Sequence, residues 1–427
     1  MKNFIQKEIR AFDTFDKNGK RLIIVNLLYS MVFPFVIVFS TAFVNRATGN
    51  QVMAVVNSFG FVAGMVAGNF INGKLLQRGI NIRYLFSIGM FLSIASTFLM
   101  MLLVKPNIGV YIIFFGFFSG LGSGLFWSNR QFLSFLVTNE DNRNFFASLD
   151  QFFIVFFNAL VPFVFGTLII GLGRKTGWFD EIWAYRLTAA VMVMLIGYAM
   201  ALILKSSFTS PVIKRFNYFS FSKIWQMHRV FALLFGLVSG GFLFFMPLLI
   251  LNVAGDETVL GKIELSMALI SVMVIYTLGR ITAAKHRPKM MFFGALVVIA
   301  GGLVLSQTIM NEELVFNVFK ISFLGVIIMK ISQVTAEPVI NMAYASTKLS
   351  DFEKAAAIEN RDSYTYVFDN ELFVGLGRIF SGILFITLNN LISSIGALQY
   401  VFIILGLLQI ITALIIKKLT NVRISSI

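Results

Sequence analysis

The sequence contains no cysteine and only two histidines. The lack of cysteine excludes disulfides, thiolate metal sites and cysteine nucleophiles together. His228 and His286 both lie among basic residues between apolar stretches, where we expect solvated loop positions rather than metal ligands. The sequence also has no Gly-x-x-x-x-Gly-Lys-Ser/Thr phosphate loop, so hydrolysis of a nucleotide by this chain is not expected. We therefore predict no metal, no cofactor and no catalytic residue.

Charged residues are scarce, at 13% of the 427 residues, against 58% hydrophobic residues. So few charges cannot cover a water-facing surface, which makes lipid the expected solvent. Twelve apolar stretches of about twenty residues match the length that a helix needs to cross a bilayer core about 30 Å thick. Runs this long without alternation exclude barrel strands. The predicted fold is an all-α polytopic membrane protein with twelve transmembrane helices.

A basic stretch from Lys205 to Arg229 divides the apolar stretches into two groups of six. The predicted spans are residues 22–44, 50–72, 84–104, 110–136, 146–170, 184–204, 230–252, 259–279, 289–308, 316–340, 365–388 and 397–416. The predicted regions are a cytoplasmic N-terminal interfacial segment (1–21), an N-terminal six-helix bundle (22–204), a central cytoplasmic loop (205–229), a C-terminal six-helix bundle (230–416) and a cytoplasmic tail (417–427).

The net charge of +15 is distributed unevenly between the two sides of these spans. With the N-terminus in the cytoplasm, 25 of the 35 Lys and Arg fall on the cytoplasmic side and six on the other. This is the positive-inside bias that sets orientation, so nucleic acid is not needed to explain the charge. We expect a monomer surrounded by lipid in the cytoplasmic (inner) membrane, with both termini in the cytoplasm.

The two groups of six share a sequence pattern before their fifth spans. Asp141-Asn142-Arg143 precedes the fifth span, and Glu359-Asn360-Arg361 precedes the eleventh. An acidic residue followed by an amide comes next in both, as Asp150-Gln151 and Asp369-Asn370. This repetition favours two pseudo-symmetric six-helix bundles.

With this layout, the chain resembles the major facilitator superfamily, of bacterial type, over essentially its whole length. Gly73-x-Leu75-x-Gln77-Arg78-Gly79, between the second and third spans, is similar to that family's Gly-x-Leu-x-Asp-Arg-x-Gly motif. Gln77 stands where the family has Asp, and the motif is one residue shorter before Gly79. The resemblance implies alternating access by rocking of the two halves, with Arg78 in the gating region.

Ionisable residues inside the spans are the candidate substrate and coupling groups, because such residues are costly in a membrane. Glu371 and Arg378 lie seven residues apart on one face of the eleventh span, about 10 Å apart along the axis. Lys330 and Glu337 repeat that spacing in the tenth span. We expect Lys330 to pair with Glu371 or Asp369 across these helices, and we assign Glu337 and Asp369 to gating. Either some of these charges contact substrate or a coupled proton, or they form an interhelical ion network.

In the first half, Arg130 and Asp150 are predicted to pair as an inner gate, the alternative being that Arg130 reaches to the lipid headgroups. Asn26, Tyr29 and Asn158 are candidates for cavity lining or plain interhelical hydrogen bonding. The spacing of Gly116, Gly120 and Gly124 predicts close helix packing instead of a dinucleotide site. Two cytoplasmic segments are predicted to be scaffolding: a helix beginning at the capping box Ser350–Glu353, and an aromatic interfacial segment at residues 216–226.

These features together predict a secondary transporter for a small organic solute, anionic or zwitterionic, coupled to protons. An exporter or flippase of amphipathic drugs or lipids is the alternative within transport. A non-transporting receptor or a membrane enzyme is a remote alternative.

Overall fold

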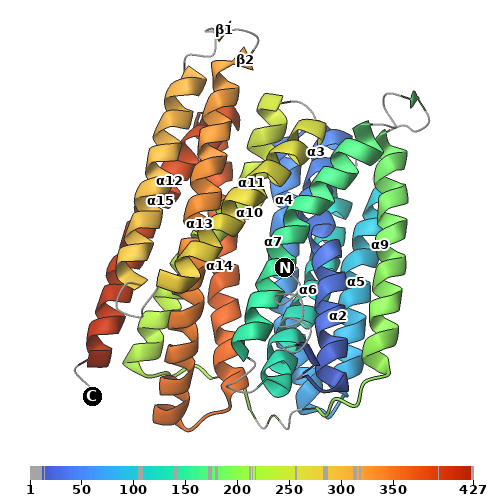
Figure 1. The fold of residues 1–427 in the computed structure, drawn as a ribbon, viewed down its shortest axis with the longest axis vertical. Helices are drawn as coiled ribbons and strands as arrows, with labels where there is room; N and C mark the ends of the chain where they lie inside the picture. The colour runs from blue at the N-terminus through green and yellow to red at the C-terminus, as the bar shows by residue number, and fades with distance from the viewer. Residues whose placement is uncertain are drawn as a thin grey trace.

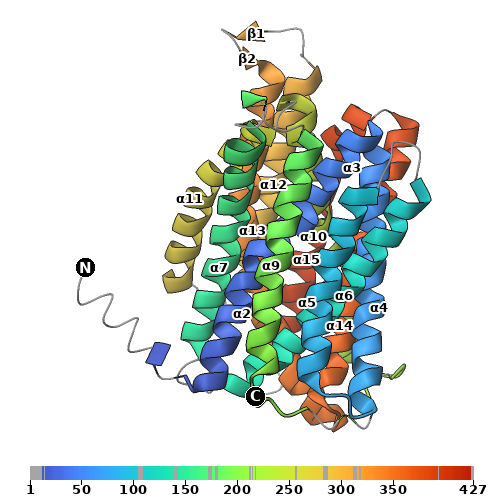
Figure 2. The same cartoon turned by 90° about the vertical axis from the view of Figure 1, so that its right-hand side faces the viewer.

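The computed structural model describes residues 12–13, 15–103, 109–138, 143–171, 176–177, 181–210, 213, 215–216, 218–254, 257–281, 287–310, 315–316, 319–392 and 394–424. Long helices run up and down one common axis and fill the molecule (Figure 1). The described start of the first span and the end of the last lie at the same end of the bundle (Figure 2).

The first half contains α2 (Lys17–Pro34), the π-helical η1 (Phe35–Phe39), α3 (Ser40–Thr48), α4 (Gln51–Gln77), α5 (Ile82–Leu103), α6 (Gly109–Val137), α7 (Arg143–Phe163), the π-helical η2 (Val164–Ile170) and α9 (Glu181–Leu204). The second half contains α10 (Lys223–Ala254), α11 (Glu257–Ile281), α12 (Arg287–Met310), α13 (Ile321–Glu359), α14 (Ser363–Leu391) and α15 (Ser394–Ile424). A two-stranded antiparallel ribbon of β1 (Val315–Phe316) and β2 (Phe319–Lys320) precedes α13.

A helix, or an unbroken run of helical segments, covers most of each of the twelve predicted spans. The predicted start of the tenth span at residue 316 is wrong, because its helix begins at Ile321, after the β ribbon. In the described part of the chain, ten helices are long and apolar enough to cross a membrane. The fifth span has a shorter apolar stretch, Phe152–Thr167, and the eighth is α11, which carries Lys262 and Glu264. Both π-helical segments follow a proline: η1 begins directly after Pro34, and η2 begins two residues after Pro162. Proline removes a backbone donor, and a local π adjustment can restore the hydrogen-bond ladder.

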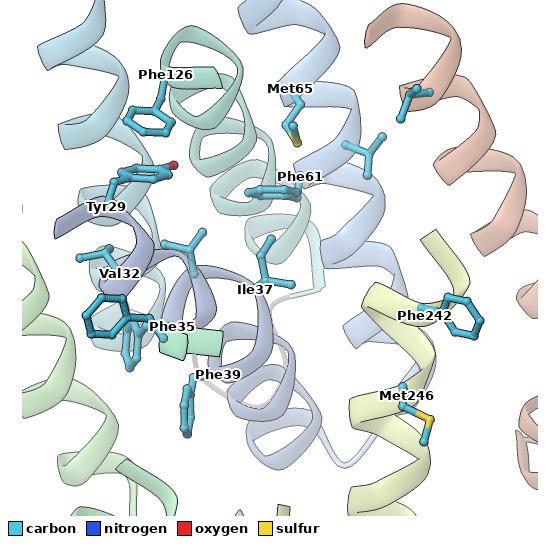
Figure 3. Close-up of a cluster of buried hydrophobic side chains, with 14 of the residues drawn as sticks. Tyr29, Val32, Phe35, Ile37, Phe39, Phe61, Met65, Phe126, Phe242 and Met246 are labelled. Atoms are coloured by element: carbon cyan, nitrogen blue, oxygen red, sulfur yellow. The ribbon is translucent and has the colours of Figure 1, made fainter. Parts of the chain in front are cut away.

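Glycines set the closest helix contacts in the first half. A Cβ added at Gly116, Gly120 or Gly124 of α6 would lie 2.5, 1.8 or 2.3 Å from a backbone oxygen of α4. The predicted packing role of these glycines is therefore confirmed. Aromatic and aliphatic side chains fill the space between the helices, as around Tyr29 of α2 and Phe35 of η1 (Figure 3).

The two halves meet through α4 against α14 and through α7 against α11 (Figure 1). Along the first of these contacts, Gly382 of α14 packs on Phe59, and Gly375 packs on Val66. At the end of the bundle where α2 begins, the Tyr364 side chain of α14 forms a hydrogen bond with Asn72 of α4. This helix pair is therefore in contact over most of its length.

The prediction of a new helix at Ser350–Glu353 is wrong, because α13 is continuous from Ile321 to Glu359. Its buried stripe continues through the capping sequence at four-residue spacing, with Ala343, Thr347, Asp351 and Ala355 all buried. Packing of this stripe keeps the helix going, and the Asp351 carboxylate bonds to His228.

The prediction of a lipid-surface segment at residues 216–226 is also wrong in its main feature. Phe216, Phe221 and Trp225 are buried within the protein, and α10 already begins at Lys223. Of the predicted N-terminal interfacial segment, residues 1–11 lie outside the described residues, as does His286.

Candidate functional site

Asp150 of α7 is the centre of a polar cluster in the first half. Its carboxylate accepts hydrogen bonds from Arg130 of α6 and, at 3.2 Å, from Asn26 of α2. The Arg130 guanidinium also lies over the Trp127 ring, 4.4 Å from its centroid. The predicted Arg130–Asp150 pair is thus present. Both partners belong to the first half, so the pair joins α6 to α7 and does not bridge the halves.

Tyr29 and Asn158 line a small cavity next to this cluster, with a volume of about 10 Å³, which is room for about one water molecule. Phe33, Phe126 and Trp127 make its wall largely aromatic, and Tyr29 stacks on Phe126 (Figure 3). The Tyr29 hydroxyl lies 3.2 Å from Ser123 Oγ and 3.4 Å from Ser93 Oγ. Tyr29 is therefore held by interhelical hydrogen bonds as well as facing the cavity.

Lys330 of α13 pairs with Glu264 of α11, with Nζ and Oε1 2.7 Å apart. The expectation that it pairs with Glu371 or Asp369 is wrong, because Lys330 points to α11 and not to α14. Lys330 also donates to Gln333 Oε1 at 3.1 Å, and Gln333 in turn donates to Glu337 at 3.0 Å. Lys330 and Glu337, which lie seven residues apart on α13, are thus connected through one amide, and the pairing with Glu264 neutralises Lys330.

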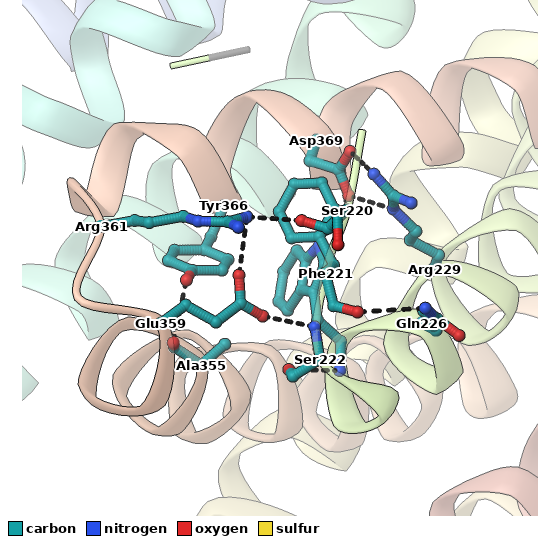
Figure 4. Close-up of polar contacts among 11 residues, drawn as sticks. Ser220, Phe221, Ser222, Gln226, Arg229, Ala355, Glu359, Arg361, Tyr366 and Asp369 are labelled. Atoms are coloured by element: carbon teal, nitrogen blue, oxygen red, sulfur yellow. Dashed lines mark hydrogen bonds and ion pairs between the residues drawn. The ribbon is translucent and has the colours of Figure 1, made fainter. Parts of the chain in front are cut away.

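Asp369 of α14 is buried and forms a two-pronged ion pair with Arg229 of α10, at 2.7 and 2.8 Å (Figure 4). The Trp225 indole donates a third hydrogen bond to it at 2.6 Å. Asp150 and Asp369 occupy matching places in the two halves. Each sits in the fifth helix of its half and bonds to the first, so the sequence echo corresponds to a structural one.

Glu371 and Arg378 stand apart from these paired charges. Among the described residues, neither has an ion-pair partner within 4.0 Å, although Glu371 lies close enough for its charge to act on Arg378. Arg378 extends from α14 toward the other half, where its guanidinium contacts Met65 Sδ of α4 at 4.0 Å. Its Nε also lies 3.5 Å from Ser239 Oγ of α10.

Lys348 of α13 is a third charge near Glu371, and no sequence pattern predicted it. It is half-buried, and its Nζ lies 5.7 Å from the centroid of the Tyr344 ring. Burial lowers the pKa of Lys348, and the negative charge of Glu371 opposes that shift. Glu371 therefore lies within electrostatic reach of two cations, Lys348 and Arg378, which leaves the three groups with one net positive charge.

His228 contradicts the expectation of a solvated loop position, because it is fully buried in α10. Its Nδ1 lies 2.9 Å from Asp351 Oδ2, and its Nε2 lies 3.1 Å from Asn370 Oδ1. The basic neighbours in the sequence lie on other faces of the helix, since residues adjacent in a helix point about 100° apart.

Tyr364 of α14 makes a polar contact between the halves. Its hydroxyl lies 3.1 Å from Asn72 Nδ2 and 3.3 Å from the Asn69 carbonyl oxygen of α4. Phe216 of the central loop packs beside it, close enough that a Cβ at Gly73 would lie 2.5 Å from its ring. Arg78, the gating residue implied by the family motif, is exposed after the last turn of α4. Its side chain has no hydrogen bond or ion pair with the described residues.

Sequence reasoning missed several of the partners: Glu264, Arg229, Lys348, His228, Asp351, Asn72 and Tyr364. The burial of His228 and Arg229 could have been predicted from the sequence. Both residues directly precede the first apolar span of the second half, and if the helix of that span begins as early as Lys223, they belong to the helix and can lie inside the bundle. The pairing of Glu264 with Lys330 has no signal in a single sequence.

A family model described as Major Facilitator Superfamily matches residues 22–356. An uncharacterized protein, YqgE of Bacillus subtilis (strain 168), is 21% identical over 396 residues, which cover 90% of this chain and 86% of that protein.

Three solved transporter structures have a similar fold at 13–14% identity. A POT family transporter in complex with a thioalcohol-conjugated peptide has a TM-score of 0.69, covering 96% of this chain and 99% of that one. The xylose transporter XylE from E. coli, in an inward-open conformation, has a TM-score of 0.66 and coverage of 94% and 95%. A mutant of the nucleoside transporter NupG has a TM-score of 0.60 and coverage of 94% and 99%.

Proposed function

This chain belongs to the major facilitator superfamily and is a multi-pass secondary transporter rather than an enzyme, and we propose that it carries a small anionic or zwitterionic organic solute together with protons. The observation that supports this proposal is the group of Lys348, Glu371 and Arg378. These are interior charges that the protein leaves without an ion-pair partner among the described residues, whereas Lys330, Asp369 and Asp150 each have one.

An interior arginine at the contact between the halves suits a negatively charged solute group. The guanidinium presents a rigid fork of donors that matches a carboxylate or phosphate. Arg378 contacts Met65 across the contact between the halves, so a solute bound there touches both halves and senses their rocking. We assign solute binding to Arg378, with Lys330 in a supporting role because Glu264 already neutralises it.

Glu371 is the proposed coupling group. When Glu371 is ionised, it competes with the solute for the positive charge of Arg378 and Lys348. When it is protonated, both cations are available to an anion. Proton binding and anion binding are thereby linked in the same direction, as symport requires.

The aromatic wall of the small cavity at Tyr29, Asn158 and Trp127 is the proposed contact for an apolar part of the solute. Solute binding there requires the cavity to widen, because it now has room for about one water molecule. The three similar solved structures are named for a peptide, for nucleosides and for xylose. These solutes differ widely in chemistry, so the structural similarity does not indicate which solute this chain carries. An exporter of amphipathic molecules remains the alternative within transport.

A thermal-shift screen of the purified protein distinguishes these solute classes, because only a bound solute stabilises by mass action. The probes are succinate, glutamate, dialanine, xylose and tetraphenylphosphonium. We expect stabilisation by an anion or a zwitterion, and loss of that stabilisation in Arg378→Gln. The matched control is Arg186→Gln, which removes an arginine that bonds to backbone carbonyls of Met101 and Leu102. Stabilisation by tetraphenylphosphonium alone would support the exporter instead.

We also propose that both termini are cytoplasmic and that the domain boundaries follow the two halves. Because the chain has no cysteine, one introduced cysteine reports its own accessibility. Cysteine at Asn50, between α3 and α4, should react with an impermeant reagent outside intact cells. Cysteine at Asn360, between α13 and α14, should not. The reverse result would invert the topology.

A further inference from the structure

Asn370 lies between His228 and Glu371 and contacts both. Its Nδ2 donates to Glu371 Oε1 at 3.1 Å. Its Oδ1 accepts from the Tyr344 hydroxyl at 2.5 Å and lies 3.1 Å from His228 Nε2. This orientation of the amide follows from its neighbours, since only the NH₂ group can donate to an ionised carboxylate.

His228 faces an oxygen acceptor at each ring nitrogen, because its Nδ1 faces the Asp351 carboxylate at 2.9 Å. His228, Asp351 and Asn370 are all buried. The Trp225 ring stacks on the imidazole with centroids 4.5 Å apart. Two acceptors require two N–H donors, and an imidazole has two only when it is protonated. The geometry thus fits an imidazolium beside an ionised Asp351.

A half-turn of the Asn370 amide produces a second consistent set of hydrogen bonds. Its NH₂ group then donates to an unprotonated His228 Nε2 and to the Tyr344 oxygen, and the Tyr344 hydroxyl hydrogen must turn away from Asn370. Its carbonyl oxygen faces Glu371, which must supply a proton to bond with it. In this set the N–H bond at His228 Nε2 is broken, with its electron pair left on nitrogen, and one O–H bond is formed on Glu371.

We propose that His228 is a second proton-binding site and that Asn370 links it to Glu371, so that the two residues hold one proton between them. This inference extends the proposed coupling function of Glu371, and its role in transport depends on that proposed function. With the proton on His228, Glu371 is ionised and neutralises part of the charge of Arg378 and Lys348. With the proton on Glu371, those cations are free to bind an anion, and the total charge of the cluster is unchanged.

The charged and titratable groups around this link come from three helices. α10 contributes His228 and Arg229, and Arg229 is occupied by Asp369. α13 contributes Tyr344, Lys348 and Asp351, and α14 contributes Asp369, Glu371 and Arg378. Within the described part of α15, no charged side chain bonds to the cluster. Each cation other than His228 keeps its place in both hydrogen-bond sets, so the exchange is confined to His228 and Glu371.

Nitrogen NMR of a protein with one histidine tests the link directly. The chain has only two histidines, so His286→Gln leaves His228 as the single imidazole to be labelled with ¹⁵N. In lipid vesicles at pH 7.5, without solute or gradient, we expect both ring nitrogens at the protonated chemical shift. Adding Glu371→Gln should move the Nε2 signal to the unprotonated position, because the neutral glutamine no longer favours the positive imidazolium and its NH₂ group can donate to Asn370 as a protonated glutamate does.

Three comparisons complete the test. Asn370→Asp together with Glu371→Gln offers only acceptors to His228 and should restore the doubly protonated signal. Glu264→Gln removes a carboxylate that pairs with Lys330 instead, and should leave the spectrum unchanged. Conversely, His228→Gln should bring up the infrared carbonyl band of a protonated carboxyl that is absent in the parent, which does not depend on folding of the Glu371 variant.

An unprotonated Nε2 in the parent would overturn the proposal, as would an Nε2 chemical shift that stays the same in Glu371→Gln. The lack of a new carboxyl band in His228→Gln would overturn it as well. Since these measurements involve no transport, the link can fail while Glu371 still couples protons to solute. Equally, a failure of the transport assays leaves the spectroscopic result intact.

Discussion

Lys330 of α13 and Glu264 of α11 form an ion pair of 2.7 Å in the interior of the second half. Removing one member of a buried pair strands the other and costs about 3–5 kcal/mol, whereas replacing both by apolar residues of similar size is often neutral. We therefore expect Lys330→Met to lower the melting temperature strongly and Lys330→Met with Glu264→Met to recover most of it. Differential scanning fluorimetry measures both. If the double variant is no more stable than the single one, Lys330 does not act mainly as the partner of Glu264.

The hydroxyl of Tyr364 joins the halves through Asn72 and Asn69, so Tyr364→Phe should favour separation of these helix ends. A hydrogen bond contributes about 1 kcal/mol, which is roughly a fivefold change in population. Spin labels at Ile80 and Ile358, both exposed, report the distance between the halves. Tyr366→Phe is the matched control, because the Tyr366 hydroxyl bonds to Ala355 within the second half. Equal effects of the two substitutions would contradict the assignment of Tyr364 to the contact between the halves.

Asp150 holds Arg130 and Asn26 within the first half, and its charge should affect the conformational equilibrium through the ends of α2, α6 and α7. We expect Asp150→Asn to fold and to shift the distance distribution measured with the same spin labels. Asp13→Asn, which removes the carboxylate of the exposed ion pair with Lys20, should have little effect. If the distribution and the transport rate are both unchanged, Arg130 and Asp150 have only a local structural role.

Gly120 allows α6 to lie directly against α4, where a Cβ would come within 1.8 Å of the Phe61 carbonyl oxygen. Gly120→Val should therefore abolish stable expression, because the clash is with backbone that cannot move aside alone. Gly197→Val in α9 adds the same side chain where nothing lies within 4 Å. It should be tolerated, as judged by size-exclusion chromatography of the solubilised protein. Loss of both variants would show general sensitivity of these helices to β-branched residues.

The twelve spans could be predicted from the sequence because apolar length alone determines which segments enter a bilayer. The Arg130–Asp150 pair was also within reach, since charges in apolar spans are few and need partners. The partner of Lys330 was not, because choosing Glu264 over Glu371 depends on which face of α13 meets α11. His228 was misjudged for a related reason. Its sequence neighbours are basic, but its surroundings come from Asp351 and Asn370, more than a hundred residues away.

The helix start predicted at Ser350 failed because tertiary packing outweighed a local capping signal. Ser350 and Glu353 have the spacing of a capping box, yet in the folded chain the helix continues through them, and the carboxylate of Asp351 between them bonds to the buried His228. The local sequence indicates which structure a segment favours by itself. Here the packing of the buried face of α13 keeps the helix continuous through Ser350.

The central claim is that Glu371 carries the coupled proton while Arg378 binds the solute. It is tested most directly in proteoliposomes with the labelled anion or zwitterion that gives the largest thermal shift, under an imposed pH gradient. Glu371→Gln should still exchange this solute across the membrane but should lose its accumulation against a gradient, and Arg378→Ala should lose binding and exchange together. Accumulation by Glu371→Gln at the wild-type level would contradict the account and leave the interior charges as a structural ion network.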